Sequence, residues 1–202
     1  MESDMLKREV WIKKVIPALI LFSLWLDGWF FPLILLPIFY VLLVEKKNLG
    51  WLGFSGRGLW FSMVISAPIV FVLVGVYYPI FLYYLPYILQ RGTIDNYGVF
   101  LDVVWYPAYE EICYRSFALT HFAELDKSRI STRNIIVNLI QSLLFLSVHK
   151  HHFSVPLVLV PILFLGLLNG FLFLKTRNIY GCIASHSALN GFALLLRYLQ
   201  SG

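Results

Sequence analysis

Charged residues and cysteines are both scarce in this chain of 202 residues: charged residues make up 13% of it, and there are two cysteines. Cys113 and Cys182 lie inside apolar runs, so they can form neither a disulfide framework nor a CxxC metal site. The chain also contains no low-complexity segment and no convincing internal repeat. Its net charge of +5 comes from Lys and Arg residues that cluster between apolar runs, as topology signals do, which argues against a nucleic-acid partner.

Apolar residues are what the chain has in abundance. Hydrophobic residues make up 59% of it, aromatic residues 17%, and the mean hydropathy is +0.76. These values predict an integral membrane protein, all-α and polytopic. Residues 1–14, MESDMLKREVWIKK, carry mixed charge and precede an apolar run without a small-residue cleavage site. They favour a retained first membrane segment over a removed signal peptide.

A helix needs about 20 mostly apolar residues to cross a bilayer. The sequence has a long apolar block at 15–44 and predicts further spans at 58–80, 99–122, 134–152, 155–174 and 179–198. Asp27-Gly28, Pro32 and Pro37 interrupt the first block, which is therefore either one kinked helix or a hairpin of two short helices. The aromatic segment 81–98 is expected to lie at the membrane interface.

The distribution of Lys and Arg favours the hairpin. With a hairpin, twelve of these residues lie on one side of the membrane and three on the other, whereas a single helix changes the division to eight against seven. Because positive residues gather on the cytoplasmic side, we predict a transmembrane helical bundle of about seven spans. Its N-terminus is then cytoplasmic and its C-terminus outside.

Two adjacent glutamates and an arginine stand within the apolar segment 99–122. An ionisable group in mid-membrane costs roughly 2.5–3.5 kcal/mol on insertion scales, so such groups normally face the bundle interior and pair. Glu111 and Arg115 are four residues apart and can pair on one helix face, which explains both structurally. Glu110 has Tyr114 as its i+4 neighbour and no cation at helical spacing, and about 100° of rotation separates it from Glu111. An unpaired carboxyl there is poised to exchange a proton.

Two further polar groups occur in later apolar segments. His149 and His152 are three residues apart, and His186 and Asn190 are four apart, so each pair can share a helix face. Singly, each is explained by interfacial solvation or by hydrogen bonds between helices. On simple registers His149 lies near the outer end of its span and His186 nearer the inner end. Interfacial solvation or snorkelling suffices for the polar residues near span ends, Asp102, His121, His151 and Arg197.

Together, the acid, imidazole and amide groups suit two kinds of chemistry. A carboxylate and an imidazole can hold and deprotonate a water while imidazole and amide N–H groups stabilise an oxyanion. Two histidines and a carboxylate can equally bind a divalent metal such as zinc and leave one position open for water. The spacing alone fits both.

Three motifs in this order carry a resemblance to a known family: EExxxR (Glu110, Glu111, Arg115), FxxxH (Phe145, His149) and HxxxN (His186, Asn190). Over 99–198 the chain resembles the CPBP family of CAAX proteases and bacteriocin-processing or Abi-type membrane proteins. The resemblance implies a glutamic intramembrane endopeptidase without a cofactor. Its catalytic core would be 99–202, with a conical or irregular water-filled cavity between the C-terminal helices, while 1–98 matches only as generic membrane helices.

By this resemblance, Glu110 and His149 would activate the water, and His186 and Asn190 would stabilise the oxyanion. The resemblance also implies supporting roles around the site for Glu111, Arg115, Tyr114 and His152. His152 extends the second motif to FxxxHxxH.

The expected substrate is a membrane-associated peptide or protein tail. The expected location is a prokaryotic plasma membrane, because the helices are short and a large soluble domain is lacking. Two other functions fit the same residues. One is a non-catalytic immunity or scaffold protein, in which the polar groups only tie helices together, and the other is a metal-dependent intramembrane protease.

Overall fold

The computed structural model describes residues 9, 11–27, 35–88, 95–125, 130–149 and 156–200. Every regular element within these ranges is helical, which confirms the all-α prediction for them. The longer helices are α2 (Ile16–Asp27), α4 (Leu59–Ile88), α8 (Thr132–Val148), α9 (Leu159–Thr176) and α10 (Tyr180–Gln200). Shorter elements precede or join them: η1 (Trp11–Val15), α3 (Leu36–Phe39), η3 (Tyr40–Val44), η4 (Leu49–Leu52) and η8 (Pro156–Val158).

The N-terminal apolar block forms two helices that pack on each other. The first is α2, and the second is α3, which continues without a break into η3. Leu21 of the first helix lies in one buried cluster with Tyr40 and Val41 of the second. The block is therefore a pair of short helices, as the charge distribution predicted, and not a single kinked helix. Residues 28–34, which would form the turn, lie outside the described ranges.

The long helix α4 extends beyond the predicted span of 58–80. It begins at Leu59, close to the predicted start, and continues to Ile88, into the segment 81–98 that we expect at the membrane interface. Pro79 does not stop the helix, since a proline in an apolar helix removes only local hydrogen bonds that its surroundings can replace. By length and composition, two described segments can cross a membrane, Leu59–Tyr83 and Pro156–Thr176.

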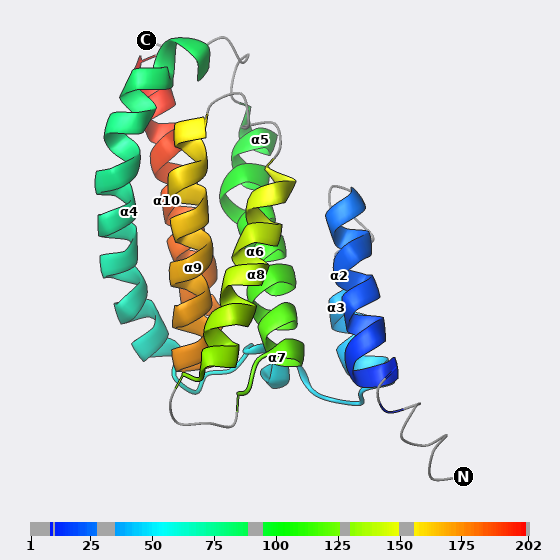
Figure 1. The fold of residues 1–202 in the computed structure, drawn as a ribbon. Helices are drawn as coiled ribbons and strands as arrows, with labels where there is room; N and C mark the ends of the chain where they lie inside the picture. Colours follow the sequence, from blue (N-terminus) through cyan, green and yellow to red (C-terminus); the bar gives the residue numbers. More distant parts are fainter. Residues whose placement is uncertain are drawn as a thin grey trace.

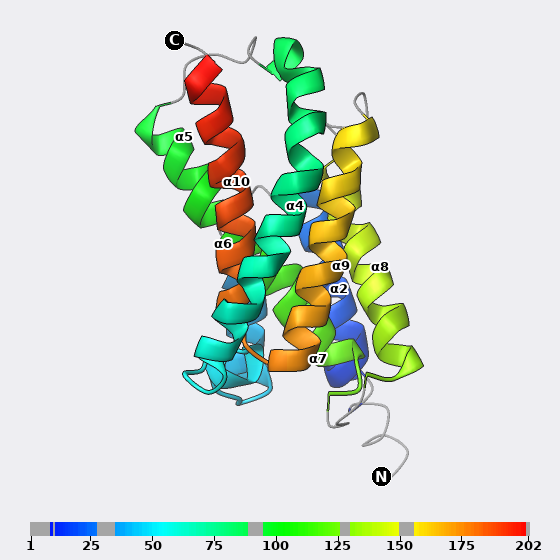
Figure 2. The ribbon, with the colours of Figure 1, turned by 90° about the vertical axis from the view of Figure 1, so that its left-hand side faces the viewer.

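The helices run alternately up and down in the bundle (Figures 1 and 2). Helices α4, α9 and α10 pack together, α8 packs on α9, and the α2–α3 pair lies beside the remaining helices (Figure 1). The chain enters α2, passes from η3 to α4, enters α8 and leaves α9 at one and the same end (Figure 1). That end therefore collects most of the described basic residues outside the helix interiors: Lys13, Lys14, Lys46, Lys47, Arg57, Arg133, Lys175 and Arg177.

Buried amides join α8 to α9 and α9 to α10. The Asn138 side chain donates to the Leu167 carbonyl over 3.1 Å and accepts from Gln141 over 2.7 Å. Gly170 allows this close approach, because a Cβ there would lie 1.7 Å from Asn138 Oδ1. On the other side, Asn169 donates to the Cys182 carbonyl over 3.0 Å. These polar groups are interhelical ties, which are common where apolar helices pack in membranes.

Candidate active site

Residues 96–122 form one continuous helix that carries the first motif, as predicted for 99–122. It consists of α5 (Asn96–Phe100), η5 (Leu101–Trp105), α6 (Tyr106–Glu110), η6 (Glu111–Phe117) and α7 (Ala118–Phe122). Asp95 caps its start, since its side chain accepts from the Gly98 N–H over 2.7 Å. The η segments contain π-type turns, in which the Ala118 N–H, for example, donates to the Cys113 carbonyl five residues earlier. Such wide turns are frequent at functional sites, and one begins directly after Glu110.

Both glutamates converge on His186 of α10. Nδ1 of His186 lies 2.9 Å from Glu111 Oε1, and Nε2 of the same ring lies 3.6 Å from Glu110 Oε2. All three residues are buried, with exposed fractions of 8% for Glu110, 0% for Glu111 and 3% for His186. The prediction that Glu110 has no partner is thus wrong. Its partner comes from another helix, which spacing within one helix cannot show.

The predicted pairing of Glu111 with Arg115 is confirmed. Arg115 Nε lies 3.2 Å from Glu111 Oε2, and both side chains are fully buried. This contact is an ion pair without the alignment of a hydrogen bond. The Arg115 guanidinium also lies over the Phe145 ring, 3.8 Å from its centroid. A buried cation is therefore held by a carboxylate and by an aromatic face.

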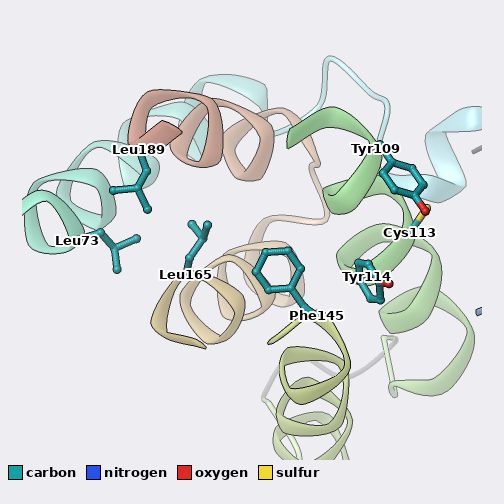
Figure 3. Packing of buried hydrophobic residues seen from close by; sticks show 7 residues of the cluster. All are labelled: Leu73, Tyr109, Cys113, Tyr114, Phe145, Leu165 and Leu189. Carbon is teal, nitrogen blue, oxygen red and sulfur yellow. The ribbon is translucent and has the colours of Figure 1, made fainter. Parts of the chain in front are cut away.

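Phe145 of α8 contacts site residues on three different helical segments. Its ring centroid lies 4.7 Å from that of His149, 5.8 Å from that of His186 and 5.8 Å from that of Tyr114. Figure 3 shows the Phe145 ring beside Tyr114, while Leu73, Leu165 and Leu189 converge from three other helices.

The two histidines thus contact one ring, although simple registers place them at different depths. In the sequence Phe145 is the first residue of the FxxxH motif, and we predicted no role for it. The signal that could have shown its role is its spacing, one helical turn before His149.

His149 follows the last residue of α8 and is half-buried. Its Nδ1 lies 2.9 Å from the Phe145 carbonyl oxygen, which can only accept a hydrogen bond. The neutral imidazole therefore carries its proton on Nδ1 and its lone pair on Nε2, the arrangement that a proton acceptor needs. His151 and His152 lie outside the described residues.

Asn190 is four residues after His186 on α10 and is half-buried. Its amide nitrogen donates to the Asp102 carbonyl over 2.8 Å, which links α10 to the site helix. Because an amide group has two N–H bonds, this link leaves one donor for another partner.

His121, at the end of α7, is buried and not solvated at an interface as predicted. Its Nδ1 contacts the Phe117 carbonyl oxygen over 2.7 Å, and its Nε2 lies 3.2 Å from Glu45 Oε1. This second carboxyl–imidazole pair lies where the N-terminal helices meet the site helix, since Tyr40 of η3 also packs on the His121 ring.

The described residues contain no group of three or more His, Cys, Asp or Glu side chains arranged to hold a metal ion. An apolar groove of about 530 Å³ runs between α2, α7 and α8 and is lined by residues that include Leu21, Phe22, Ala118 and Leu144. The groove therefore lies between one N-terminal helix and two helices of the C-terminal half.

A buried carboxylate, two imidazoles and an amide within an apolar helical bundle are the parts of a hydrolase that activates water. Residues 93–192 match the family of type II CAAX prenyl endopeptidase Rce1-like proteins, and this range contains all the predicted site residues. Through this segment the chain belongs to that family, whose members are peptide hydrolases of membranes. No curated protein and no solved structure shows significant similarity to the chain.

Proposed function

We propose that this protein is an intramembrane endopeptidase that uses Glu110 to hydrolyse a peptide bond in a membrane-associated peptide or protein tail. The observation that carries the proposal is the convergence of Glu110 and Glu111 on His186, inside the segment that matches the endopeptidase family. An acid, an imidazole and an ion pair so deeply buried are costly to keep in an apolar bundle and typically mark a functional site.

The proposed reaction begins with a water held by Glu110 and by Nε2 of His149. As the water oxygen attacks the substrate carbonyl carbon, its proton passes to one of these two groups, and a tetrahedral oxyanion forms. N–H groups of His186 and Asn190 stabilise the oxyanion. The carbon–nitrogen bond then breaks, and the proton moves from the base to the leaving amine, which leaves the enzyme in its starting state.

The alternating helices also support the proposed topology. If the helical segments that alternate in Figure 1 all cross the bilayer, the basic end of the bundle faces the cytoplasm together with the N-terminus. This arrangement gives the seven-span protein that we propose for a prokaryotic plasma membrane.

The test is the substitution Glu110→Gln, which keeps the size of the side chain and removes its charge. Membranes with wild-type protein are expected to accumulate membrane-protein fragments, detected by mass spectrometry, that are missing with Glu110→Gln. Glu45→Gln is the matched control, because Glu45 also contacts a buried histidine but lies away from the site. Fragments that persist with a folded Glu110→Gln variant would refute the role of Glu110.

The same preparation separates the two competing functions. A non-catalytic scaffold would lose stability with Glu110→Gln but keep its biological effect. A metal-dependent protease would contain metal by elemental analysis of the purified protein and would lose activity in chelator, whereas we expect full activity in chelator.

A further inference from the structure

We propose that the apolar groove between α2 and α8 binds an acyl chain of an anionic phospholipid, whose phosphate group lies between Lys14 and Arg133 at the basic end of the bundle. The inference needs the protein to lie in a membrane, as members of its family do, but it does not depend on the cleavage of a substrate.

The lining of the groove suits a hydrocarbon chain. Leu21 of α2, Ala118 of α7 and Gln141 of α8 are buried and form its floor, and Gln141 donates its amide N–H groups to atoms of α8 and α9. Phe22 and Ile140 also line the groove, but each is more than half exposed. These two residues therefore form a rim that leaves the groove open to the surrounding lipid. Its volume of about 530 Å³ is in the range of sites for small ligands.

Two cations stand one helical turn before the groove. Lys14 precedes the groove residue Ala18 by four positions, and Arg133 precedes the groove residue Val137 by four. Residues four apart share a helix face, so both cations lie on the groove side of their helices. Since α2 and α8 begin at the same end of the bundle, the two cations lie at the same end of the groove (Figure 1).

Phe122 of α7, which lines the groove, contacts both cations. Lys14 Nζ lies 5.6 Å from the centroid of the Phe122 ring, and Arg133 Nε donates to the Phe122 carbonyl over 3.1 Å. One residue at the end of the groove therefore has an ammonium group on its ring and a guanidinium group on its backbone. A phosphate group there would meet two positive charges together.

Both cations keep donors for such a phosphate. Lys14 donates to the His121 carbonyl over 2.6 Å, but an ammonium group has three N–H bonds. Arg133 Nη1 lies 4.0 Å from Glu124 Oε1, at the limit of an ion pair, and a guanidinium group has five N–H bonds. The two side chains can thus bind an anion without giving up the contacts that hold them in place.

The length of the groove favours a lipid chain over a membrane-spanning segment of a protein. Arg133 and Leu144 mark its two ends on α8, and the eleven positions between them correspond to about 16 Å of α-helix. This is about half of the hydrocarbon thickness of a bilayer, roughly 30 Å, so the groove spans one leaflet. Beyond Leu144, the Trp25 indole N–H donates to Ser147 Oγ over 2.7 Å and joins α2 to α8.

Cations at the membrane surface and an apolar groove one leaflet deep match the two parts of an anionic phospholipid. A chain in the groove would contact α2, α7 and α8 at once. We therefore expect the lipid to stabilise the packing of the first N-terminal helix on the helices that carry the first two motifs.

The experiment uses the full chain purified in detergent and titrated with phosphatidylglycerol or, in parallel, with phosphatidylcholine that has the same acyl chains. Native mass spectrometry counts the bound lipids. We expect one phosphatidylglycerol to bind more tightly than phosphatidylcholine by roughly 30-fold, because each cation near an anionic lipid surface contributes about fivefold. A photoreactive group at the end of the acyl chain should label Trp25 or Leu144, at the far end of the groove.

Two variants separate the groove from a general attraction to basic residues. Lys14→Gln combined with Arg133→Gln should abolish the preference for phosphatidylglycerol. Lys47→Gln combined with Lys175→Gln is the matched control, since it removes two exposed cations from the same end of the bundle but away from the groove, and it should keep the preference.

A further variant tests the groove itself. Ala18→Trp places a large side chain in the groove from an exposed position on α2, so it should abolish binding of the lipid and labelling by its chain. This variant leaves both cations in place and serves if the first double variant does not fold.

Three results would overturn the inference. One is equal affinity of the wild-type protein for the two lipids, and another is an equal loss of preference in the two double variants. The third is labelling outside the groove, or on a second copy of the chain. None of these measurements needs a substrate, so the inference can fail while the proposed protease activity holds, and the reverse.

Discussion

Phe145 offers the sharpest test of how the site is held together. Its ring is fully buried and contacts the Arg115 guanidinium and the imidazoles of His149 and His186. The substitution Phe145→Leu keeps an apolar side chain but removes the aromatic face. We expect it to destabilise the protein and to misplace both histidines at once.

The magnitude can be worked from these contacts. A desolvated cation over an aromatic face contributes about 2 kcal/mol, and each edge contact between aromatic rings about 0.5–1.5 kcal/mol. The free energy of unfolding should therefore fall by about 3 kcal/mol or more in Phe145→Leu. A displacement of catalytic groups by about 1 Å can cost about 10²-fold in rate, so kcat should fall by about that factor.

Phe173→Leu is the matched control for this change. Phe173 is equally buried, but its cation neighbour, Arg177, lies 5.9 Å from the ring centroid, and its cluster lies apart from the site residues. We expect a loss of about 1 kcal/mol and little change in kcat per folded molecule. Unfolding in mixed micelles and cleavage by reconstituted protein measure the two quantities. Equal losses of stability and of kcat in both variants would refute the proposed role of Phe145.

Two other predictions concern packing and pH. Gly170→Ala should lower the free energy of unfolding in micelles by about 1–3 kcal/mol, because the added Cβ would lie 1.7 Å from Asn138 Oδ1. Gly75→Ala, whose Cβ would meet open space on α4, should raise the free energy of unfolding by up to about 1 kcal/mol. A loss in Gly75→Ala as large as in Gly170→Ala would contradict the close approach of α8 and α9. Burial raises the pKa of the Glu45 carboxyl, against the opposing effect of nearby lysines, so folding favours its protonated form. The contribution of Glu45 to stability should therefore be greatest below the ordinary carboxyl pKa and should be lost as pH rises through the raised value. Glu45→Gln should remove this contribution from the unfolding profile, and a profile unchanged by the substitution would show that Glu45 does not couple folding to pH.

The sequence was sufficient for those features that depend on neighbours along one helix. The spacing of Glu111 and Arg115 predicted their ion pair, because residues four apart lie on one face of a helix. The interrupted apolar block at 15–44 and the distribution of lysines and arginines predicted two helices in place of one. The three motifs led to the same family as the match over 93–192.

Features that depend on contacts between helices needed the tertiary structure. Glu110 is unpaired by spacing within its own helix, yet His186 lies beside it because α10 packs against the site helix. His121 seemed to need only interfacial solvation, but Glu45 reaches it from a distant part of the chain.

Helical periodicity is determined by local hydrogen bonds, and so a sequence pattern records which residues share a face of one helix. Which face meets which neighbour depends on how whole helices rotate, bend and approach one another, and on glycines such as Gly170 that permit close contact. The sequence alone therefore determined the residue types available for catalysis and the helices that carry them. Only the packing of those helices decided that one imidazole lies between two carboxylates and that one phenylalanine ring contacts an arginine and two histidines.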